Sequence, residues 1–522
     1  MLKNFQNHRG IFIFLAFFII GVGLISAPQG VRAHSQETSG DDPKLVFPVI
    51  SDTQIGRAEG GVQRFENAFR QLNNVAPKQD AFVFIGDLTS HGYEKEYDAW
   101  LSVFNEYIQP QTEQIIGIGN HEYVGPTVKQ AQKRFLKKTG MDSLNYSKVM
   151  KGYTFIMLGE ERGYFYSKEQ IKWLEKELQR AEQRNPNKPI FVFMHHPLKN
   201  TNYGTDQWYI DKENQKLLRD ALSQHPQVIL MAGHTHYPVS DPRQIYQNNF
   251  TSVNSGSIAY MWTESGYLQG EVPPVEVSNG LLVKVYDDKV VIKRRKFHAN
   301  EWVGNPWVIK TPIQKKNFKY IDTRDNKKPY FTNDAKLSVV RDKTTSTSVG
   351  IKFDQAQDNL LTHSYNVTVK NQETNKITLD NKAFSEYYKA QIPNPLTLPV
   401  NGLKPATIYK IEVRAIDAFE NKSKDTLTAT AITKAEHAEG MKKLVKQFQE
   451  NGEFATDQAA QFLKIHLTAL SLYEENELAE KIVKHMEGFK LLLDHQKKNK
   501  LISEKVYDVL KANADYIIQK WK

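Results

Sequence analysis

Short apolar runs separated by longer stretches with helical spacing fill the first half of the chain. Five of these runs are continuous rather than alternating, at Leu45 to Ile50, Phe82 to Ile85, Ile115 to Ile118, Ile190 to Met194 and Val228 to Met231. A continuous apolar run of this length is typical of a strand that is buried on both faces. The amphipathic stretches between the runs indicate helices that cross from one strand to the next. Residues 44–307 are therefore predicted to form an α/β domain.

The pattern changes twice beyond this domain. Residues 308–330 are polar and rich in lysine, contain Pro312 and Pro329, and are predicted to form a linker. Residues 331–434 alternate apolar with polar positions, as in Val349, Ile351 and Phe353, which favours a small, half-exposed β-sandwich. Residues 437–522 return to helical spacing, which predicts an α-helical bundle.

Three apolar stripes form the expected core of that bundle. They are Phe462, Ile465, Leu470 and Tyr473; Leu478, Ile482, Val483, Met486 and Phe489; and Val506, Leu510, Ile517 and Trp521. Stripes of this kind are far more often core than cofactor site, so the bundle is assigned no chemistry.

Length and composition agree with several globular domains and exclude some chemistry. A chain of 522 residues exceeds the usual size of one domain, and 40% hydrophobic residues suffice for real cores. The chain has no cysteine, so disulfides, thiolate nucleophiles and thiolate zinc sites are excluded. The net charge of +10 favours anionic surroundings such as phosphorylated substrates, cell-wall polymers or lipid headgroups. A solvated basic surface without a partner fits the same charge equally well.

The first 33 residues are predicted to be a signal peptide. Lys3, His8 and Arg9 precede an apolar run from Ile11 to Ile25, and small residues around Ala33 follow it. An uncleaved anchor is the alternative, but the run is shorter than the roughly 20 residues that a spanning helix needs. We therefore expect an exported protein, extracellular or associated with the cell envelope, without a transmembrane helix in the mature chain.

Each of the five predicted strands ends in a cluster of polar residues. The clusters are Asp52-Thr53-Gln54, Gly86-Asp87, Gly119-Asn120-His121-Glu122, His195-His196-Pro197 and Gly233-His234-Thr235-His236. Ligands bind outside the carboxyl ends of strands in such sheets, so the clusters are expected to converge on one site. Carboxylate, imidazole and amide donors suit divalent Mn, Fe, Zn or Mg.

Spacing within the clusters also favours a metal site. Successive side chains of a strand point to opposite sides, so Asp52 with Gln54, and His234 with His236, are expected to share one side. Glycines beside Asp87, Asn120 and His234 allow tight turns and close approach of the backbone to a ligand.

The order Asp-x-(His or Gln), Gly-Asp, Gly-Asn-His-(Asp or Glu), His, Gly-His-x-His resembles the motif set of the calcineurin-like metallophosphoesterases. The resemblance implies an αββα sandwich that carries two divalent metal ions. It implies that Asp87 bridges both ions, with one further held by Asp52, Gln54 and His236, and the other by Asn120, His195 and His234. His195 is preferred to His196 because the ligand in this family stands two positions before the proline.

The same resemblance gives His121 a catalytic role, in which it stabilises or protonates the leaving oxygen. A hydrogen-bonded turn residue is the plainer alternative for His121. Gln54 departs from the commonest pattern, because many members have histidine there. An amide oxygen is a harder and weaker donor than imidazole, so the ion is expected to be Mn or Mg rather than Zn, with Mn favoured.

Two further resemblances cover the rest of the chain. The segment from Leu403, with Tyr409, Val413, Ala415, Asp417 and Asn421, resembles the fibronectin type III family around its tyrosine corner. The last helices resemble a C-terminal helical module of exported bacterial enzymes, which implies no chemistry. Association with the cell wall or envelope through these regions is a hypothesis from architecture alone.

The leading function is hydrolysis of a phosphomonoester or phosphodiester, such as a nucleotide or cyclic nucleotide, by metal-activated hydroxide. A cell-surface binding protein with a catalytically spent scaffold is the alternative. A nuclease is a third reading, but no base-recognition motif is present, and specific nucleic-acid binding is not expected. Loops with His91, Tyr123, Asn200, Tyr203 and Trp208 are expected to shape the substrate pocket. Arg57 could reach a phosphate oxygen, although an ordinary surface arginine is the simpler interpretation.

Overall fold

The structure is a computed structural model that describes residues 42–57, 59–207, 209–210, 212–262, 264, 266–269 and 277–522. The expected signal peptide and Trp208 lie outside the described residues. Among the described residues, no helix combines the length and apolar character that crossing a membrane requires.

Two β-sheets form the centre of the first domain. One has the order β12-β11-β10-β1-β2-β3, with β13 paired to β11, and the other has the order β4-β5-β6-β7-β9-β8. The first sheet contains β1 (Leu45–Ile50), β2 (Ala81–Ile85), β3 (Glu113–Gly117), β10 (Asn279–Val285), β11 (Lys289–Lys296), β12 (Glu301–Trp302) and β13 (Trp307–Lys310). The second contains β4 (Asn145–Met150), β5 (Tyr153–Leu158), β6 (Ile190–Met194), β7 (Val228–Ala232), β8 (Ile245–Gln247) and β9 (Thr251–Asn254).

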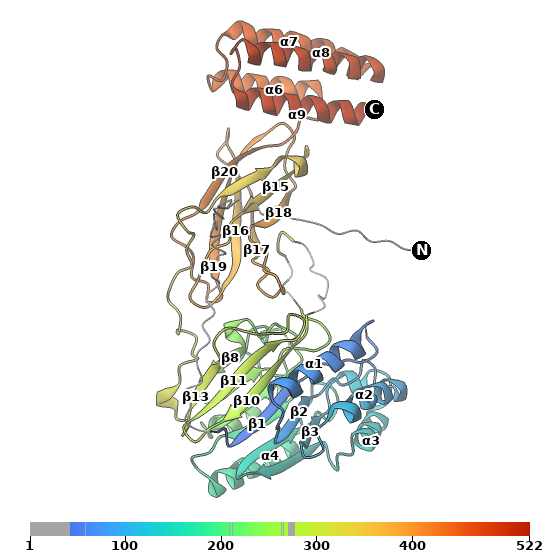
Figure 1. The fold of residues 1–522 in the computed structure, drawn as a ribbon, viewed down its shortest axis with the longest axis vertical. Coiled ribbons are helices and arrows are strands. Elements are labelled where there is room, and N and C mark those ends of the chain that lie inside the picture. Colours follow the sequence, from blue (N-terminus) through green and yellow to red (C-terminus); the bar gives the residue numbers. More distant parts are fainter. Residues whose placement is uncertain are drawn as a thin grey trace, which may run out of the picture. The chain divides into compact units, whose positions relative to one another are not determined.

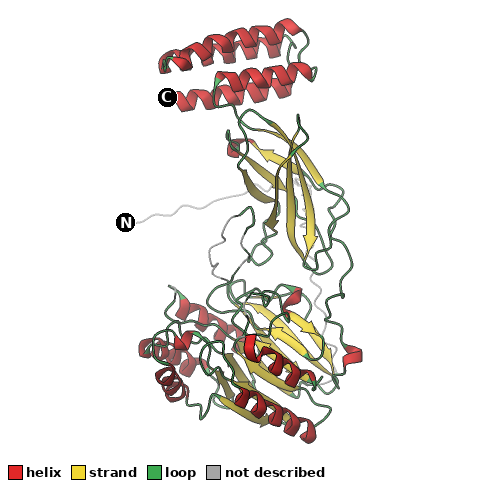
Figure 2. Ribbon diagram, turned by 180° about the vertical axis from the view of Figure 1, so that it is seen from behind, coloured by secondary structure: helices red, strands yellow, loops and turns green. Residues whose placement is uncertain are grey.

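Helices cover the outer faces of both sheets (Figures 1 and 2). They are α1 (Gly61–Val75), α2 (Glu94–Tyr107) and α3 (Val128–Thr139) on the first sheet, and α4 (Lys168–Arg184) and α5 (Lys212–Ser223) on the second. The largest apolar core of the described residues joins the facing sides of the two sheets. There the Phe47 ring packs edge-on against the rings of Phe155 and Phe191, with 5.0 Å between ring centroids in each pair. The mixed α/β prediction is confirmed.

Parallel pairing brings the polar clusters to one end of each sheet. Strands β1, β2 and β3 pair in parallel, and β5, β6, β7 and β9 do so in the second sheet. The five apolar runs of the sequence are thus real strands, but they belong to two sheets, three in one and two in the other. The polar clusters therefore converge from the carboxyl ends of strands in two facing sheets.

The segment predicted as a linker differs from that expectation at its start. Strand β13 pairs with β11 through Val308 and Ile309. Ile309 and Ile313 are buried in the core between the sheets, and the backbone N–H of Val308 donates to the Tyr320 hydroxyl at 2.7 Å. Apolar side chains spaced widely among lysines hold this stretch on the domain.

Residues beyond this segment form two sheets with a shared core. One has the order β14-β15-β18 and the other β17-β16-β19-β20. The strands are β14 (Leu337–Val340), β15 (Ser348–Phe353), β16 (Thr362–Asn371), β17 (Ile377–Phe384), β18 (Leu396–Asn401), β19 (Ile408–Asp417) and β20 (Leu427–Ile432). Val349, Ile351 and Phe353 are buried between the sheets, as their alternation predicts.

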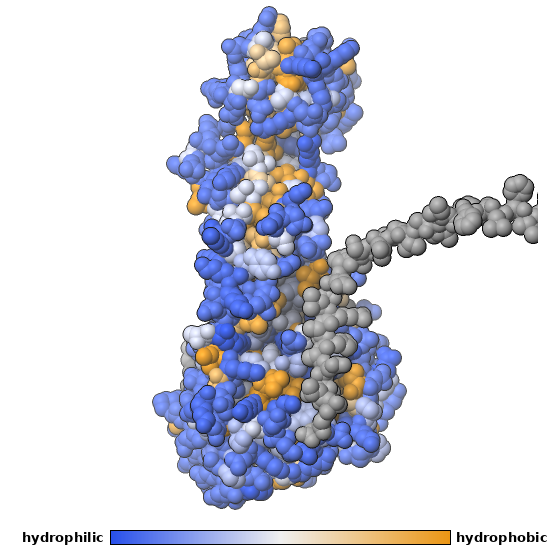
Figure 3. Space-filling model, turned by 60° about the vertical axis from the view of Figure 1, so that its left-hand side comes forward, coloured by the Kyte–Doolittle hydropathy of each residue, from blue (hydrophilic) through white to orange (hydrophobic). Residues whose placement is uncertain are grey.

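Four helices end the chain: α6 (Ala438–Glu450), α7 (Asp457–Glu475), α8 (Ala479–Lys498) and α9 (Glu504–Trp521). The predicted stripe on α7 is wrong in register at its start, because Phe462 and Ile465 are 51% and 56% exposed, whereas Leu470 is buried and Tyr473 packs against the core as predicted. The buried positions are instead Ala459, Ala460, Leu463, Leu467 and Leu470. Apolar residues of this helix lie on most of its sides, so their periodicity did not single out one buried face. Figure 3 shows apolar patches on this bundle within a mostly hydrophilic surface.

Candidate metal centre

The candidate ligands lie just beyond the strand ends and share an unusual backbone conformation. Asp52, Gln54, Asp87, His234 and His236 all have positive φ, between 40° and 66°. Left-handed backbone in non-glycine residues costs about 1–3 kcal/mol each and concentrates at functional sites. Asp52 and Gln54 thus share a side because of this turn geometry, and the strand alternation invoked from the sequence does not apply, since β1 ends at Ile50.

Two glycines allow the ligand loops to approach one another. A Cβ on Gly233 would lie 2.6 Å from Ser51 Oγ and 2.7 Å from Asp52 Oδ2. Gly86 has φ +74°, and a Cβ there would lie 2.9 Å from His195 Nδ1. Only glycine fits at these positions, in agreement with the close approach expected from the sequence.

One group of donors gathers around Asp52, Gln54, Asp87 and His236. Asp52 Oδ1 lies 3.0 Å from His236 Nε2, and Gln54 Nε2 lies 3.3 Å from the same nitrogen. Gln54 Nε2 also lies 3.2 Å from Asp87 Oδ2. Potential ligand atoms of Asp52, Asp87 and His236 all lie within 4.8 Å of one another, which fits a single ion.

A second group shares Asp87 with the first. His195 Nε2 lies 3.1 Å from Asp87 Oδ2 and 3.1 Å from Asn120 Oδ1. The rings of His195 and His234 are 5.2 Å apart, and His234 donates its backbone N–H to Asp52 Oδ2 at 3.0 Å. Asp87 therefore stands between two donor groups, and all seven side chains proposed from the sequence meet in one place.

Backbone carbonyls fix the orientation of three histidine rings. Nδ1 lies 2.8 Å from Ile85 O in His195, 3.0 Å from Tyr260 O in His236 and 2.8 Å from Ser90 O in His121. A neutral ring that donates from Nδ1 to a carbonyl leaves the lone pair of Nε2 free for a metal ion. In His195 and His236 that nitrogen faces the carboxylates.

Orphaned donor atoms make this donor set fit divalent cations. Asp52 Oδ1 and Gln54 Oε1 are buried and accept no hydrogen bond. Buried polar atoms without a partner are costly, and a bound cation satisfies them. The oxygen and nitrogen donors suit first-row divalent ions, and no thiolate is present.

The charges at the centre are strongly coupled. Burial opposes ionisation of Asp87, but the nearby His195 and His121 outweigh it and hold the pKa of this carboxyl well below its usual range. Burial also lowers the pKa of His195, yet the charges of Asp87 and Asp52 raise it well above normal. The buried carboxylates thus demand positive charge, which metal ions supply in place of protons.

His196 packs against the ligands without pointing at Asp87. Its ring lies 3.5 Å from that of His234, centroid to centroid, and its Nδ1 pairs with Glu160 Oε1. Burial and the charge of His195 lower its pKa well below normal, which favours a neutral ring. Ligand atoms of His195, His196 and His234 also lie within 4.8 Å of one another. The pairing with Glu160 nevertheless favours His195 as the ligand, as the sequence motif implies.

Glu122 holds the loops that carry the ligands. Its Oε2 accepts from the backbone N–H groups of Asp87 at 3.0 Å and Gly119 at 2.9 Å, and its Oε1 accepts from the N–H of Thr89 at 2.8 Å. Burial and the charge of Asp87 raise the pKa of Glu122 to about 8. The sequence placed Glu122 within a motif but gave it no role.

His121 begins a 3₁₀ turn (His121–Tyr123) at the edge of the centre. Its backbone N–H donates to Asp87 Oδ1 at 2.9 Å, and its Nε2 lies 3.9 Å from Asp87 Oδ2. The side chain is 18% exposed, so it can face a substrate. His121 can therefore be a hydrogen-bonded turn residue and still act in catalysis.

Arg57 and Tyr260 lie together beside His236. The Arg57 guanidinium is 4.7 Å from the centre of the Tyr260 ring, which is 4.3 Å from the His236 ring. Arg57 is exposed and thus free to meet an anion near the centre. No sequence motif marked Tyr260.

Of the loop residues expected to shape the pocket, Tyr123 and Tyr203 are engaged in packing contacts, whereas Asn200 is exposed and His91 is partly exposed. Tyr123 is committed to packing, because its hydroxyl donates to Glu160 O at 2.6 Å, and the Tyr203 ring lies 3.4 Å from the Arg243 guanidinium. His91 is half-exposed and bonds Glu96, and Asn200 has φ 53°.

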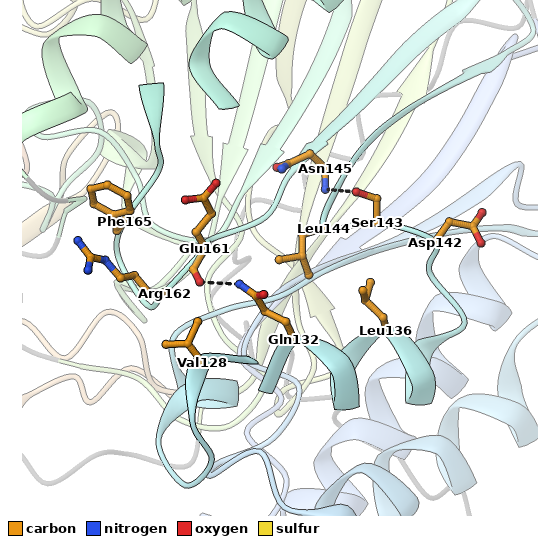
Figure 4. A pocket seen from close by; sticks show the side chains of 10 residues that line it. All are labelled: Val128, Gln132, Leu136, Asp142, Ser143, Leu144, Asn145, Glu161, Arg162 and Phe165. Carbon is orange, nitrogen blue, oxygen red and sulfur yellow. Dashed lines mark hydrogen bonds between the residues drawn. The ribbon is translucent and has the colours of Figure 1, made fainter. Parts of the chain in front are cut away.

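A surface cavity of about 650 Å³ lies on the side of the Glu161–Phe165 turn where α3 packs. Figure 4 shows Gln132 of α3 and Arg162 among its walls, and Gln132 Nε2 donates to Glu161 O at 2.7 Å. None of the seven candidate ligands lines it. The cavity is thus separate from the metal centre.

Comparison with known proteins matches two parts of this chain to families. Residues 46–238 match the calcineurin-like phosphoesterases, and residues 438–519 match the FIMAH domain. "Probable glycerophosphodiester phosphodiesterase GpdQ" of Arcobacter nitrofigilis is 28% identical over 213 residues, which are 37% of this chain and 72% of that protein. "Probable purple acid phosphatase 20" of Arabidopsis thaliana is 24% identical over 256 residues, 46% of this chain and 57% of that protein.

The structure of purple acid phosphatase PPD1 from yellow lupin (Lupinus luteus) seeds has 16% identity and a TM-score of 0.40. The match covers 51% of this chain and 55% of the lupin protein. The chain thus spans little more than half the length of the two purple acid phosphatases.

Proposed function

Because residues 46–238 are a calcineurin-like phosphoesterase domain and the chain is a metal-dependent phosphoester hydrolase, we propose that it is an exported dinuclear enzyme that hydrolyses phosphomonoesters or phosphodiesters. One observation carries this proposal. Two donor groups share Asp87, with the side chain of His121 beside them.

In this proposal Asp52, Gln54, Asp87 and His236 hold one ion, and Asp87, Asn120, His195 and His234 hold the other. When bound, two divalent ions there would activate water near neutral pH and would neutralise charge on phosphoryl oxygens. The carbonyls of Ile85 and Tyr260 keep the rings of His195 and His236 turned toward the centre.

His121 is the proposed proton donor to the leaving oxygen. Its Nδ1 is held at Ser90 O, so Nε2 is the atom that delivers the proton. Arg57, over Tyr260, is proposed to bind a non-bridging phosphate oxygen or a second anionic group of the substrate.

The substrate class is the least constrained part of the proposal. Nucleotides, cyclic nucleotides and glycerophosphodiesters are the first compounds to compare, since one relative is named for a glycerophosphodiester activity. Single-stranded DNA belongs in the same screen, where its cleavage would support the nuclease reading.

The test compares bis(p-nitrophenyl) phosphate with p-nitrophenyl phosphate after loading the protein with Mn, Fe, Zn or Mg. We expect metal-dependent turnover in the parent and its loss in Asp87→Ala, with Asp342→Ala as the exposed control. A parent that stays inert with every ion would favour the surface-binding protein with a spent scaffold.

We propose Mn as the preferred ion because the Gln54 amide oxygen is a harder and weaker donor than imidazole. Metal analysis of the parent beside Gln54→His tests this. Unchanged occupancy and unchanged metal preference in the variant would contradict it.

We propose further that the chain is exported and that its last two domains attach it to the cell envelope. Amino-terminal sequencing of secreted protein tests export, and an intact Met1 would contradict it. A chain truncated after Arg324, which keeps β13 and its buried contacts, tests attachment. Equal wall binding by this truncated chain would contradict it.

The sandwich is proposed to be of the fibronectin type III kind. The Tyr409 hydroxyl accepts a hydrogen bond from the backbone N–H of Lys404 at 2.9 Å. This bond to a residue shortly upstream supports the tyrosine corner that the sequence suggests. Tyr409→Phe removes only the hydroxyl and is expected to lower sandwich stability by about 1 kcal/mol.

A further inference from the structure

Three aspartates meet at one end of the sandwich, in a place that the phosphoesterase chemistry does not use. They are Asp325 in the segment after β13, Asp358 in the loop between β15 and β16, and Asp417 at the end of β19. One carboxylate oxygen from each lies within 4.8 Å of the others. Segments nearly one hundred positions apart in the chain thus place acidic side chains next to one another.

Backbone groups hold each carboxylate in place. Asp358 Oδ2 accepts from the N–H groups of Leu360 at 2.7 Å and Leu361 at 2.8 Å. Asp417 Oδ1 accepts from the N–H of Asn421 at 2.8 Å. These bonds fix the orientation of the side chains, but they do not remove the repulsion among three like charges.

Two oxygens of the cluster are buried without a partner. Asp325 is 8% exposed, and its Oδ2 accepts no hydrogen bond. Asp358 is partly buried, and its Oδ1 atom is buried and accepts no hydrogen bond. Within the described part of the chain, no lysine, arginine or histidine forms an ion pair with any of the three. Buried carboxylates without hydrogen bonds or counter-charges are costly, so these atoms indicate a missing cation.

The chemistry of the cluster selects a hard cation. All candidate donors are oxygens, and the carbonyl of Asp325 also lies at the cluster, where it accepts from Asn421 Nδ2 at 3.3 Å. Ca²⁺ takes oxygen ligands at about 2.3–2.6 Å in flexible geometry, so ligands on opposite sides of the ion are about 4.6–5.2 Å apart. Mg²⁺ needs a tighter octahedral arrangement, and Zn²⁺ prefers nitrogen or sulfur.

We propose that Asp325, Asp358 and Asp417 form a calcium site that fastens the segment after β13 to two loops of the sandwich. This site is independent of the dinuclear centre. Calcium neutralises the three carboxylates and satisfies the orphaned oxygens of Asp325 and Asp358. Its affinity is expected in the range of extracellular calcium modules, at about 10⁻⁴–10⁻³ M.

The experiment uses the full chain, loaded with Mn²⁺ so that the dinuclear centre does not compete, and then dialysed free of unbound Mn²⁺, which would bind the same oxygens. Calcium binding is measured by equilibrium dialysis and thermal unfolding is recorded over a calcium titration. We expect the parent to bind one calcium per chain and to melt several degrees higher with calcium. Asp358→Asn should bind at least tenfold more weakly, whereas the exposed Asp342→Asn should behave like the parent.

Thermal unfolding in EDTA separates a cation site from a purely structural role. The Asp358→Asn substitution keeps an oxygen for the N–H groups of Leu360 and Leu361 but removes one repelling charge. The Asp358→Asn protein should therefore melt at or above the parent temperature in EDTA, and below it with calcium. Lower melting in EDTA, no calcium bound by the parent, equal binding by the variant, or an equal effect of Mg²⁺ would each overturn the calcium assignment.

Discussion

The carboxylate of Glu122 accepts a hydrogen bond from the backbone N–H of Asp87 at 3.0 Å, so a side chain outside the ligand set fixes the residue that both ligand groups share. The other oxygen of Glu122 accepts from the N–H and hydroxyl of Thr89. In this arrangement every partner of the Glu122 side chain is a donor.

Glu122→Gln should therefore destabilise the domain and weaken metal binding. The new amide nitrogen faces at least one N–H donor whichever way it turns, so at least one hydrogen bond is lost within a buried site and one donor is left without an acceptor. We expect a loss of about 2–4 kcal/mol in unfolding free energy, together with lower metal content. Calorimetry and metal analysis measure both quantities. Glu106→Gln, at an exposed position of α2, is the control, and parent-like stability of Glu122→Gln would refute the assigned role.

His121→Gln should slow turnover without changing metal content, because its side chain lies outside the ligand set. A proton donor matters most when the leaving group is a poor one. We expect kcat to fall about 100-fold or more for a glycerophosphodiester and much less for bis(p-nitrophenyl) phosphate. Equal losses on both substrates would assign His121 to orientation of the substrate rather than to proton transfer. The exposed His495→Gln, on the helical bundle, is the matched control.

Gly119→Ala should displace Asp87 and reduce metal occupancy. A Cβ at this position would lie closer to Asp87 Oδ1 and to the Asp87 backbone nitrogen than nonbonded atoms approach. One of the two loops must shift, and the shared ligand moves with it. Gly61→Ala is the control, since a Cβ there meets nothing within 4 Å. Full metal occupancy in Gly119→Ala, measured by metal analysis, would contradict this account.

The sequence revealed the ligands of this centre because their types and order are distinctive, and because each follows an apolar run. It did not reveal how Asp52 and Gln54 come to share a side, since left-handed backbone at non-glycine residues has no local signal. Tyr260 and Glu160 also escaped notice. Their contacts with His236 and His196 link segments far apart in the chain, and such contacts depend on the sheets having assembled.

The helical bundle shows a different limit. Its helices follow from composition and spacing, and Met486, Phe489 and Leu510 are buried as predicted. The register of α7 did not follow, because Phe462 and Leu463 are neighbours of similar hydrophobicity, and only packing against the other helices chooses between them.

Alanine substitutions on α7 test that register. Leu463→Ala should cost about 2–4 kcal/mol because it leaves a cavity in the core, whereas Phe462→Ala should cost less than about 1 kcal/mol. Hydrogen exchange of peptides from α7 measures the difference in the intact chain. A larger loss from Phe462→Ala would restore the stripe expected from the sequence.

Acidification should loosen the bundle through His466. Its ring lies 3.9 Å from that of His485, and its Nδ1 is buried without a hydrogen-bond partner. Burial, helped by the charge of His485, lowers the pKa of His466 to about 4. The unfolded chain binds this proton near pH 6.5, so the folded state takes up fewer protons between the two values and stability falls as pH drops from about 6.5 toward 4.

The ring is partly exposed, so the expected loss is only about 1–2 kcal/mol of unfolding free energy, less than the full shift would give. Hydrogen exchange of α7 and α8 peptides, corrected for intrinsic rates, measures it at pH 7 and pH 5. His466→Gln removes the titrating group and should make α7 and α8 less sensitive to this change, whereas the exposed His495→Gln should leave the parent's sensitivity intact. If His466→Gln loosened as much as the parent on acidification, the proton would bind elsewhere and His466 would have no part in the effect.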